Sequence, residues 1–151
     1  MANSSTDIDK SVVPEAGPAA QISTLRQRRE FLFVQHKGVR QVMPHFILQA
    51  AIPAARPGSP SASTSACHIR TGLTASKKVG NAVMRNRAKR RMRVLMAQLG
   101  RMQTPCRADY VLVARHSLVR ADWLALCADF TTAAEQVNRK LLASDQQERA
   151  L

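Results

Sequence analysis

The stretch Gly72–Arg93, GLTASKKVGNAVMRNRAKRRMR, decides the fold of this chain because a strand pattern passes directly into a helix pattern. From residue 68 to 76 apolar and polar side chains alternate, which is typical of a strand with one buried and one polar face. Asn81 is a residue type that caps helix N-termini. The stretch therefore predicts a strand, a turn around Gly80 and a helix that runs to about Leu99.

The predicted helix carries a charge pattern that solvent alone does not explain. Projected at helical spacing, its apolar residues fall within one arc of about 120°, and every other direction is cationic. The apolar arc holds Met84, Ala88, Met92, Leu95, Met96 and Leu99. Like charges four residues apart cost ~0.2–0.5 kcal/mol per pair, and a helix that merely faced water would offset them with Glu. We therefore expect neutralisation by a phosphate backbone, which Arg binds through paired hydrogen bonds.

The whole chain is strongly basic and has the size of one domain. Its 151 residues include 23 Lys or Arg against 10 Asp or Glu, for a net charge of +13. Such a charge indicates a polyanionic partner, either nucleic acid or a membrane surface. No apolar run approaches the ~18 residues of a spanning helix. The first twenty residues carry acids in place of a basic, apolar export signal, so we expect a cytoplasmic protein that does not enter a membrane.

Acids are missing from the middle of the chain. Between Phe31 and Ala108 there is no Asp or Glu, whereas 14 Lys or Arg fall in that span. A hydrolase ordinarily needs carboxylates to hold Mg²⁺ or to act as a general base. The four His and three Cys stand at no metal-ligand spacing and beside no evident nucleophile or base. We expect no catalytic residue and no metal site among the protein's own side chains.

Periodicity divides the chain into elements in the order α-β-β-β-α-β-α. The predicted helices are 25–36, 82–99 and 120–142, and the predicted strands are 39–43, 45–52, 68–76 and 109–115. Ser23 or Thr24 is expected to cap the first helix. Residues 1–21 are expected to form a disordered extension and 143–151 a flexible tail, and the Pro, Ala and Ser rich segment 53–66 a loop lengthened by low-complexity insertion. The pattern predicts a single α+β domain, an α/β sandwich of a sheet packed on helices.

The segment Arg70–Arg93 resembles the signature of the bacterial ribonuclease P protein family, in which a strand ending in Ser-Lys-Lys leads through a Gly turn into an Arg-Asn-Arg helix. LRQRREFLFVQHKG, residues 25–38, resembles the family's first helix, and ADYVLVAR, residues 108–115, resembles its last strand. The resemblance covers about residues 22–142 and implies a ribosomal-protein-like fold. It also implies a left-handed β-α-β crossover around the basic helix, where strand twist alone predicts a right-handed one.

The resemblance further implies the function. In this family an RNA subunit is the catalyst that removes 5′ leaders from precursor tRNA, and the protein subunit helps it bind precursor and metal. This chain is accordingly expected to be a subunit of an endoribonuclease whose RNA-containing holoenzyme requires Mg²⁺. Its expected partners are the catalytic RNA and precursor tRNA, without an obligate protein partner. The lack of acids agrees with that division of labour.

Two sets of site residues follow from the resemblance. The first would contact the catalytic RNA from the turn and the basic helix, with two positions on the polar strand face that would approach either RNA. The turn and helix positions are Lys77, Lys78, Arg85, Asn86, Arg87, Lys89, Arg90 and Arg93, and the strand positions are Arg70 and Ser76. The second set, Phe31, Val34 and Phe46, would line a cleft through which the single-stranded leader threads.

The aromatic positions of the expected cleft admit two interpretations. Phe31 and Phe46 match the family's leader contacts, where stacking is worth ~1–3 kcal/mol per base, but they fit a buried core equally well. Relatives often carry further aromatics where this chain has Gln35 and Gln49, so leader contacts are expected to rely more on hydrogen bonds.

Two other classes of protein share the basic composition. A ribosomal or architectural RNA-binding protein would have the same charge, and even the same fold, without supporting cleavage of a precursor. A DNA-binding helix ranks last, because no second helix stands at helix-turn-helix spacing and no heptads form a zipper. The spacing from Ser-Lys-Lys to Arg-Asn-Arg favours the ribonuclease P family over both.

Overall fold

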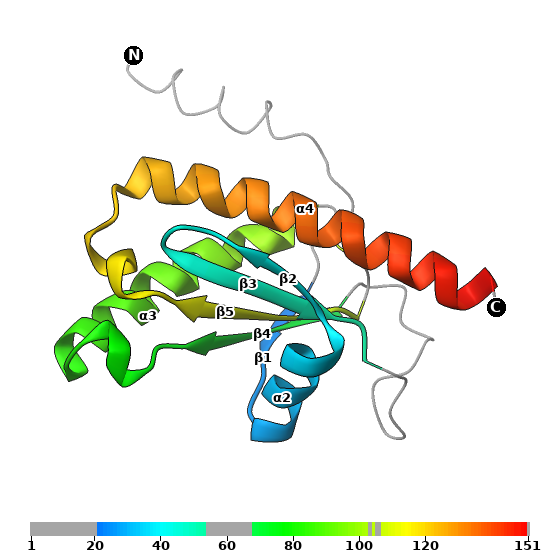
Figure 1. The fold of residues 1–151 in the computed structure, drawn as a ribbon, viewed down its shortest axis with the longest axis horizontal. Coiled ribbons are helices and arrows are strands. Elements are labelled where there is room, and N and C mark those ends of the chain that lie inside the picture. Colours follow the sequence, from blue (N-terminus) through cyan, green and yellow to red (C-terminus); the bar gives the residue numbers. More distant parts are fainter. Residues whose placement is uncertain (1–20, 54–67, 103, 105–106, 151) are drawn as a thin grey trace, which may run out of the picture.

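The computed structural model describes residues 21–53, 68–102, 104 and 107–150. The expected N-terminal extension and the expected loop insertion lie outside these residues, apart from Gln21 and Pro53 at their edges. The described part forms a mixed sheet and three α-helices (Figure 1). The α+β class predicted from the sequence is confirmed.

The described chain contains five strands, three α-helices and three 3-10 helices. The strands are β1 (Gln21–Thr24), β2 (Val39–Val42), β3 (Phe46–Ala51), β4 (His68–Thr74) and β5 (Asp109–Ala114). The α-helices are α2 (Arg28–Lys37), α3 (Ala82–Ala97) and α4 (Trp123–Ala150). Three short 3-10 helices, η1 (Lys77–Val79), η2 (Gln98–Arg101) and η3 (His116–Arg120), lie between them.

The five strands are ordered β1-β4-β5-β3-β2 across the sheet. β1, β4 and β5 run parallel, whereas β3 runs antiparallel to β5 and to β2. β3 and β5 pair over their whole length, from Phe46 opposite Ala114 to Ala51 opposite Asp109. The sheet is therefore centred on β5, which pairs with a parallel strand on one side and an antiparallel strand on the other.

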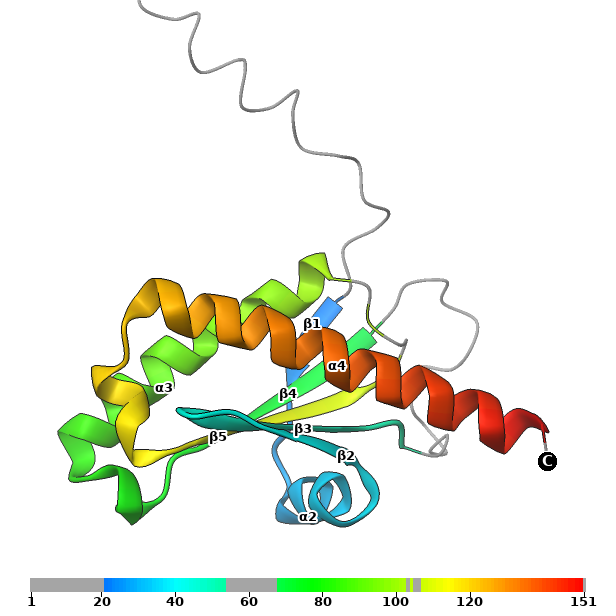
Figure 2. The ribbon, with the colours of Figure 1, turned by 45° about the horizontal axis from the view of Figure 1, so that its top comes forward.

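Helices cover the two faces of the sheet unequally (Figure 2). α3 and α4 lie on one face, where α3 packs on β4 and β5 and α4 on β2 and β3. Among the described residues, α2 is the one α-helix on the other face. Because successive strand residues point to opposite faces, alternate residues of β3 belong to different cores. Phe46, Leu48 and Ala50 join the main core under α3 and α4, while Ala51 joins a smaller cluster under α2.

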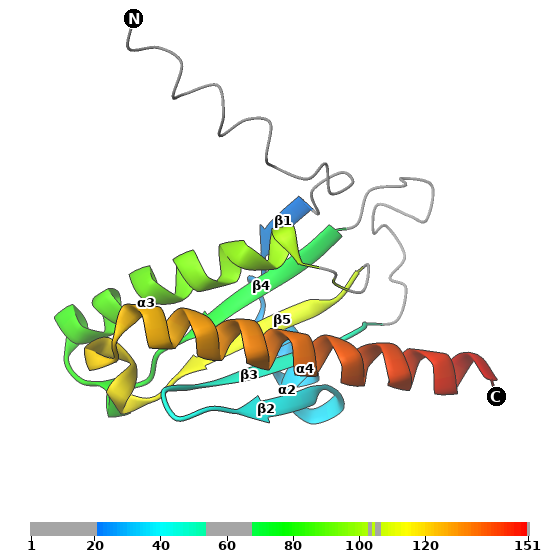
Figure 3. The same ribbon diagram turned by 90° about the horizontal axis from the view of Figure 1, so that it is seen from above.

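The connection from β4 through α3 to β5 is a left-handed crossover (Figure 3). Both strands run in the same direction, and α3 lies on the near side of the sheet in this view. With the strands pointing upward, β5 lies to the left of β4 when seen from the helix side. The handedness implied by the family resemblance is confirmed, against the general preference for right-handed crossovers.

Three element boundaries differ from the sequence predictions. Residues 21–24 form the edge strand β1, so Ser23 and Thr24 do not cap a helix, and the first helix begins at Arg28. Leu25, which was expected to begin that helix, lies before it and is buried in the smaller cluster under α2. α4 continues to Ala150, so the segment from residue 143 to 150 is helical and not the expected tail.

No helix in the described part of the chain is both long and apolar enough to cross a bilayer.

A buried tyrosine joins the sheet to α4. Tyr110 on β5 is fully buried, and its hydroxyl donates a hydrogen bond to Asn138 Oδ1 at 2.5 Å. Burial raises the pKa of Tyr110 above its ordinary value, because the phenolate would lose its hydration. The neutral phenol is thus favoured by folding.

The chain has a single tyrosine, so its titration can be followed directly. A raised pKa in the folded state means that the contribution of Tyr110 to stability is complete below about pH 10 and is lost as the pH rises further. We predict that tyrosinate absorbance appears only together with cooperative unfolding, monitored by circular dichroism on the same sample. Ionisation at about pH 10 with the fold intact would contradict this.

Candidate nucleic-acid interface

The turn between β4 and α3 lets a helix begin directly after the strand. η1 makes one 3-10 turn, and Gly80 follows with φ of 143°, a value that strains any residue with a side chain. Asn81 then accepts the backbone N–H of Met84 through its Oδ1 at 3.0 Å. The predicted N-cap is confirmed, and it satisfies one of the unpaired donors at the start of α3.

The predicted apolar arc of the basic helix packs against the sheet. Ala88, Met92, Leu95 and Met96 are buried in the main core, Leu99 follows in η2, and Met84 is half-buried against the same cluster. Burying a side chain of this size contributes about 1.5–3 kcal/mol, which outweighs the repulsion among the cations of α3.

The opposite side of α3 presents the predicted RNA-binding residues to solvent. Ser76, Lys77, Lys78, Asn86, Arg87, Arg90 and Arg93 are exposed, and Arg85 and Lys89 are half-buried. Asn86, Arg87 and Arg90 line a shallow surface hollow together with the exposed Val83. Within the described residues the ion pairs belong to Arg70 and none joins α3 to a carboxylate. The hollow therefore combines two guanidinium groups, an amide and one apolar side chain.

Arg91 is the exception among the cations of α3, because it turns inward. Its Nη1 donates to the carbonyl oxygens of Leu118 at 3.1 Å and Ala121 at 2.6 Å, and its guanidinium lies 5.8 Å from the centre of the Trp123 ring. These contacts tie α3 to η3 and to the start of α4. Arg91 thus serves the fold and not the exposed surface.

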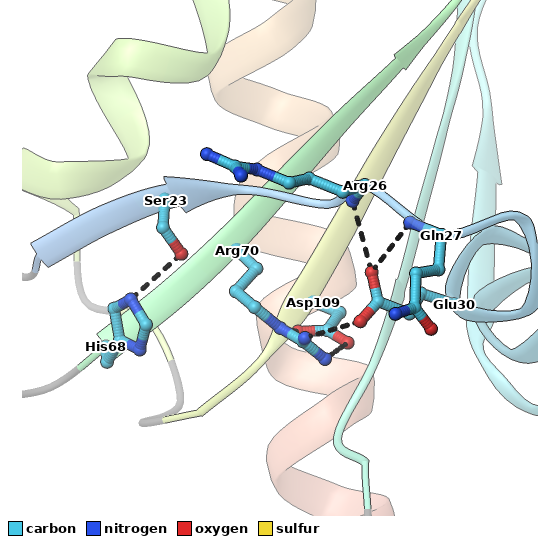
Figure 4. A network of polar contacts seen from close by, with 7 residues as sticks. All are labelled: Ser23, Arg26, Gln27, Glu30, His68, Arg70 and Asp109. Carbon is cyan, nitrogen blue, oxygen red and sulfur yellow. Dashed lines mark hydrogen bonds and ion pairs between the residues drawn. The ribbon is translucent and has the colours of Figure 1, made fainter. Parts of the chain in front are cut away.

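Arg70 does not lie with the α3 cations, and its side chain is held by two carboxylates (Figure 4). Nε and Nη2 donate to the two oxygens of Asp109 at 2.8 and 2.6 Å, and Nη1 donates to Glu30 Oε1 at 2.9 Å. The hydrogen bonds to Asp109 are the main cause that raises the pKa of Arg70, so the group stays charged. The prediction that Arg70 contacts RNA stays a prediction, and the structure shows that its guanidinium is already engaged by two carboxylates inside the protein.

The expected leader cleft is also corrected at two of its three residues. Phe46 is fully buried in the main core beside Phe130, and Val34 is buried in the smaller core, so neither can stack on a base. Phe31 is half-buried at the edge of the smaller core. Gln49, one of the two expected hydrogen-bonding positions, is buried as well, whereas Gln35 is exposed. Phe31 is therefore the one aromatic of the predicted set that is partly accessible to solvent.

Gly72 makes room for the Phe31 ring. A Cβ at Gly72 would collide with Cε1 and Cζ of Phe31, so the ring lies directly against the backbone of β4. This contact, and the ion pairs of Arg70, involve residues that the sequence did not single out: Glu30, Gly72 and Asp109. The sequence did contain a signal for Glu30, because Gln27 and Glu30 have the spacing of a capping box at the start of a helix.

The family model for Ribonuclease P matches residues 20–138, which is most of the chain. The chain belongs to the ribonuclease P protein family. The match begins at β1 and includes the Ser-Lys-Lys turn and the whole of α3.

Individual ribonuclease P proteins agree with the family model. The ribonuclease P protein component of Paramagnetospirillum magneticum is 36% identical over 119 residues, covering 79% of this chain and 85% of that protein. The component of Brucella melitensis biotype 1 is 36% identical over 124 residues, covering 82% of this chain and 80% of that protein. Membership of this family implies a role in the 5′ processing of tRNA.

Solved ribonuclease P proteins share the fold. The protein of Thermotoga maritima superposes with a TM-score of 0.59 at 21% identity, covering 76% of this chain and 97% of that chain. The protein of Staphylococcus aureus superposes with a TM-score of 0.58 at 20% identity, covering 76% and 96%. At these identities the likeness bears on the fold alone.

The structural role of Arg91 can be separated from the exposed cations by stability measurements. We predict that Arg91→Ala lowers the free energy of unfolding by about 1–3 kcal/mol, because the carbonyl oxygens of Leu118 and Ala121 both lose the hydrogen bond from the Arg91 guanidinium. Arg93→Ala, which removes an exposed cation two residues away, is expected to stay within about 0.5 kcal/mol of the parent. Urea denaturation of the free protein measures both. Equal stability of the two variants would show that the inward contacts of Arg91 are dispensable.

Proposed function

We propose that this chain is the protein subunit of ribonuclease P and that it binds both the catalytic RNA and the 5′ leader of precursor tRNA. It assists the endonucleolytic removal of the leader in the cytoplasm. The observation that carries the proposal is the basic surface of α3 and η1, in a chain of this family, with no carboxylate bound to it among the described residues.

The chemistry of the exposed surface supports RNA as its partner. Arg87 and Arg90 provide planar donors that match phosphate oxygens, and Asn86 in the same hollow can both donate and accept at a sugar or base edge. Val83 adds an apolar contact in the same hollow. Lys77 and Lys78 extend the charge to the turn before the helix. We assign this surface to the catalytic RNA.

Catalysis and metal binding are assigned to the RNA. The acids that border the basic stretch, Glu30 and Asp109, are engaged by Arg70, which argues against their serving as Mg²⁺ ligands or as a general base. A basic surface without free carboxylates beside it would contribute by positioning and charge, while Mg²⁺ bound to the RNA would supply the activated water. We expect the isolated protein to be unable to cleave a precursor.

The leader is assigned to the other face of the sheet, beside α2. Phe31 is half-buried there, and its ring rests on Gly72. Val113 and Ile47 are also only partly buried on this side, so the leader would meet an aromatic ring and the aliphatic sheet surface. Base stacking on an aromatic side chain is tolerant of sequence, which suits leaders of many tRNAs.

Reconstitution tests the proposal and its α3 surface together. We predict that the protein stimulates 5′ cleavage of precursor tRNA by its cognate ribonuclease P RNA at low Mg²⁺, and that Arg87→Ala and Arg90→Ala reduce the stimulation. If about five phosphates are neutralised, log K for the RNA falls with log salt at a slope near −4, and each variant should make the slope shallower by about one. Arg139→Ala, an exposed arginine of α4, is the control with the same change in charge.

Two outcomes would contradict this assignment. Tight RNA binding without any stimulation of cleavage would favour an architectural RNA-binding protein. A salt slope that Arg139→Ala lowers as much as Arg87→Ala does would mean that net charge, and not the surface of α3, determines binding.

The leader contact has its own test. We predict that Phe31→Ala weakens binding of precursor tRNA to the holoenzyme by about 5- to 150-fold, the equivalent of ~1–3 kcal/mol, with little effect on mature tRNA. Equilibrium binding of both ligands measures the difference, and circular dichroism checks the fold. Equal losses for precursor and mature tRNA would show that Phe31 has only a structural role.

A further inference from the structure

Arg70 connects three elements through one guanidinium group. It projects from β4, binds Asp109 on β5 and binds Glu30 on α2 (Figure 4). The other oxygen of Glu30 accepts the backbone N–H groups of Arg26 and Gln27 at 3.2 and 3.3 Å, just before α2 begins. The N-terminus of α2 is therefore attached to the sheet through Arg70.

The same attachment determines where the Phe31 ring lies. Phe31 follows Glu30 on α2, and Gly72 lies two residues after Arg70 on β4, on the same face of the strand. The ion pair between residues 30 and 70 and the ring contact between residues 31 and 72 are thus adjacent links between the same two elements. A movement of α2 that breaks the first also displaces the second.

Burial makes the ion pairs of Arg70 with Glu30 and Asp109 costly to break. The side chains of Glu30 and Asp109 are 8% and 1% exposed, whereas that of Arg70 is 23% exposed. Separating such charges leaves a buried carboxylate without its cation, which is far more costly than breaking an ion pair in solvent. Arg70 is consequently poorly suited to leave its carboxylates for a phosphate.

From these contacts we propose that Arg70 is a positioning residue for leader recognition: it holds α2 so that the Phe31 ring stays on Gly72, and it does not bind RNA itself. The inference rests on the proposed contact between Phe31 and the leader. It reassigns the one basic residue of the polar strand face from RNA binding to the geometry of the leader site.

A double-mutant cycle in the reconstituted holoenzyme tests the proposal. Arg70→Met and Glu30→Gln are each combined with Phe31→Ala, and the ratio of affinities for precursor and mature tRNA is measured. We expect each single variant to lower this ratio at least about fivefold, the size of one weakened stacking contact. In the Phe31→Ala background the same changes should have almost no further effect on the ratio.

The sign of the Glu30→Gln effect distinguishes positioning from direct contact. Glu30→Gln makes the chain one unit more positive than +13 and releases Arg70 from one carboxylate. If Arg70 bound RNA directly, this variant would bind precursor as well as the parent or better, since RNA affinity rises with positive charge. Positioning predicts a weaker preference for precursor. Glu135→Gln, an exposed acid of α4, is the charge-matched control and should leave the preference unchanged.

A third variant addresses the case in which Arg70→Met fails to fold. Gly72→Ala leaves all three charges in place but pushes the Phe31 ring away from β4. We expect it to lower the preference for precursor as Glu30→Gln does. An unchanged preference in both Glu30→Gln and Gly72→Ala, while Phe31→Ala alone reduces it, would overturn the inference. No effect of Phe31→Ala itself would instead refute the proposed leader contact.

Discussion

The ion pairs that Arg70 makes with Asp109 and Glu30 fix the position of α2 relative to the sheet. Asp109 begins the central strand β5, and Glu30 lies in the first turn of α2, so one side chain of β4 connects the centre of the sheet to the helix on its second face. These two acids are also the ones that border the acid-free stretch of the sequence. The two carboxylates that border the basic region in the chain are therefore bound inside the protein by Arg70 of β4.

The remaining cations of that stretch are tolerated because α3 is anchored independently of them. Its buried stripe packs on β4 and β5, Asn81 caps its start, and Arg91 turns inward to two backbone carbonyls. Several repulsive pairs of a few tenths of a kcal/mol each are small against the burial of Met92, Leu95 and Leu99. The exposed side of the helix is thus available for a polyanion without a large loss of stability.

The left-handed crossover places α3 on the face of the sheet opposite to α2. Since α3 lies on one face of the sheet and α2 on the other, the surface assigned to the catalytic RNA and the ring assigned to the leader are separated by the sheet itself (Figure 2). β4 contributes to both, because it runs into η1 and α3 at its end and carries Arg70 and Gly72 on its other face. Under the proposed function, the strand would relate the position of the RNA subunit to that of its substrate.

Local sequence patterns predict a large part of the fold. The alternation in residues 68–76, the cap at Asn81 and the apolar arc of the basic helix predicted the strand, the helix and its buried side, because each depends on neighbours within one or two turns. The motif from Ser-Lys-Lys to Arg-Asn-Arg carried the family resemblance. Periodicity did not predict β1, because four residues that pair along the edge of β4 look locally like a helix cap.

The sequence by itself determined that the chain forms one basic α+β domain with an acid-free helix suited to phosphate. Only the tertiary structure decided which cations and aromatics are exposed. Arg70 and Arg87 look alike in the chain, and so do Phe46 and Phe31, but Arg70 is held by acids and Phe46 is enclosed by α4, while Arg87 and Phe31 reach the surface. The reason is physical: burial and ion pairing depend on residues about 40 to 80 positions away, whose distance in space is set by strand order and not by local spacing.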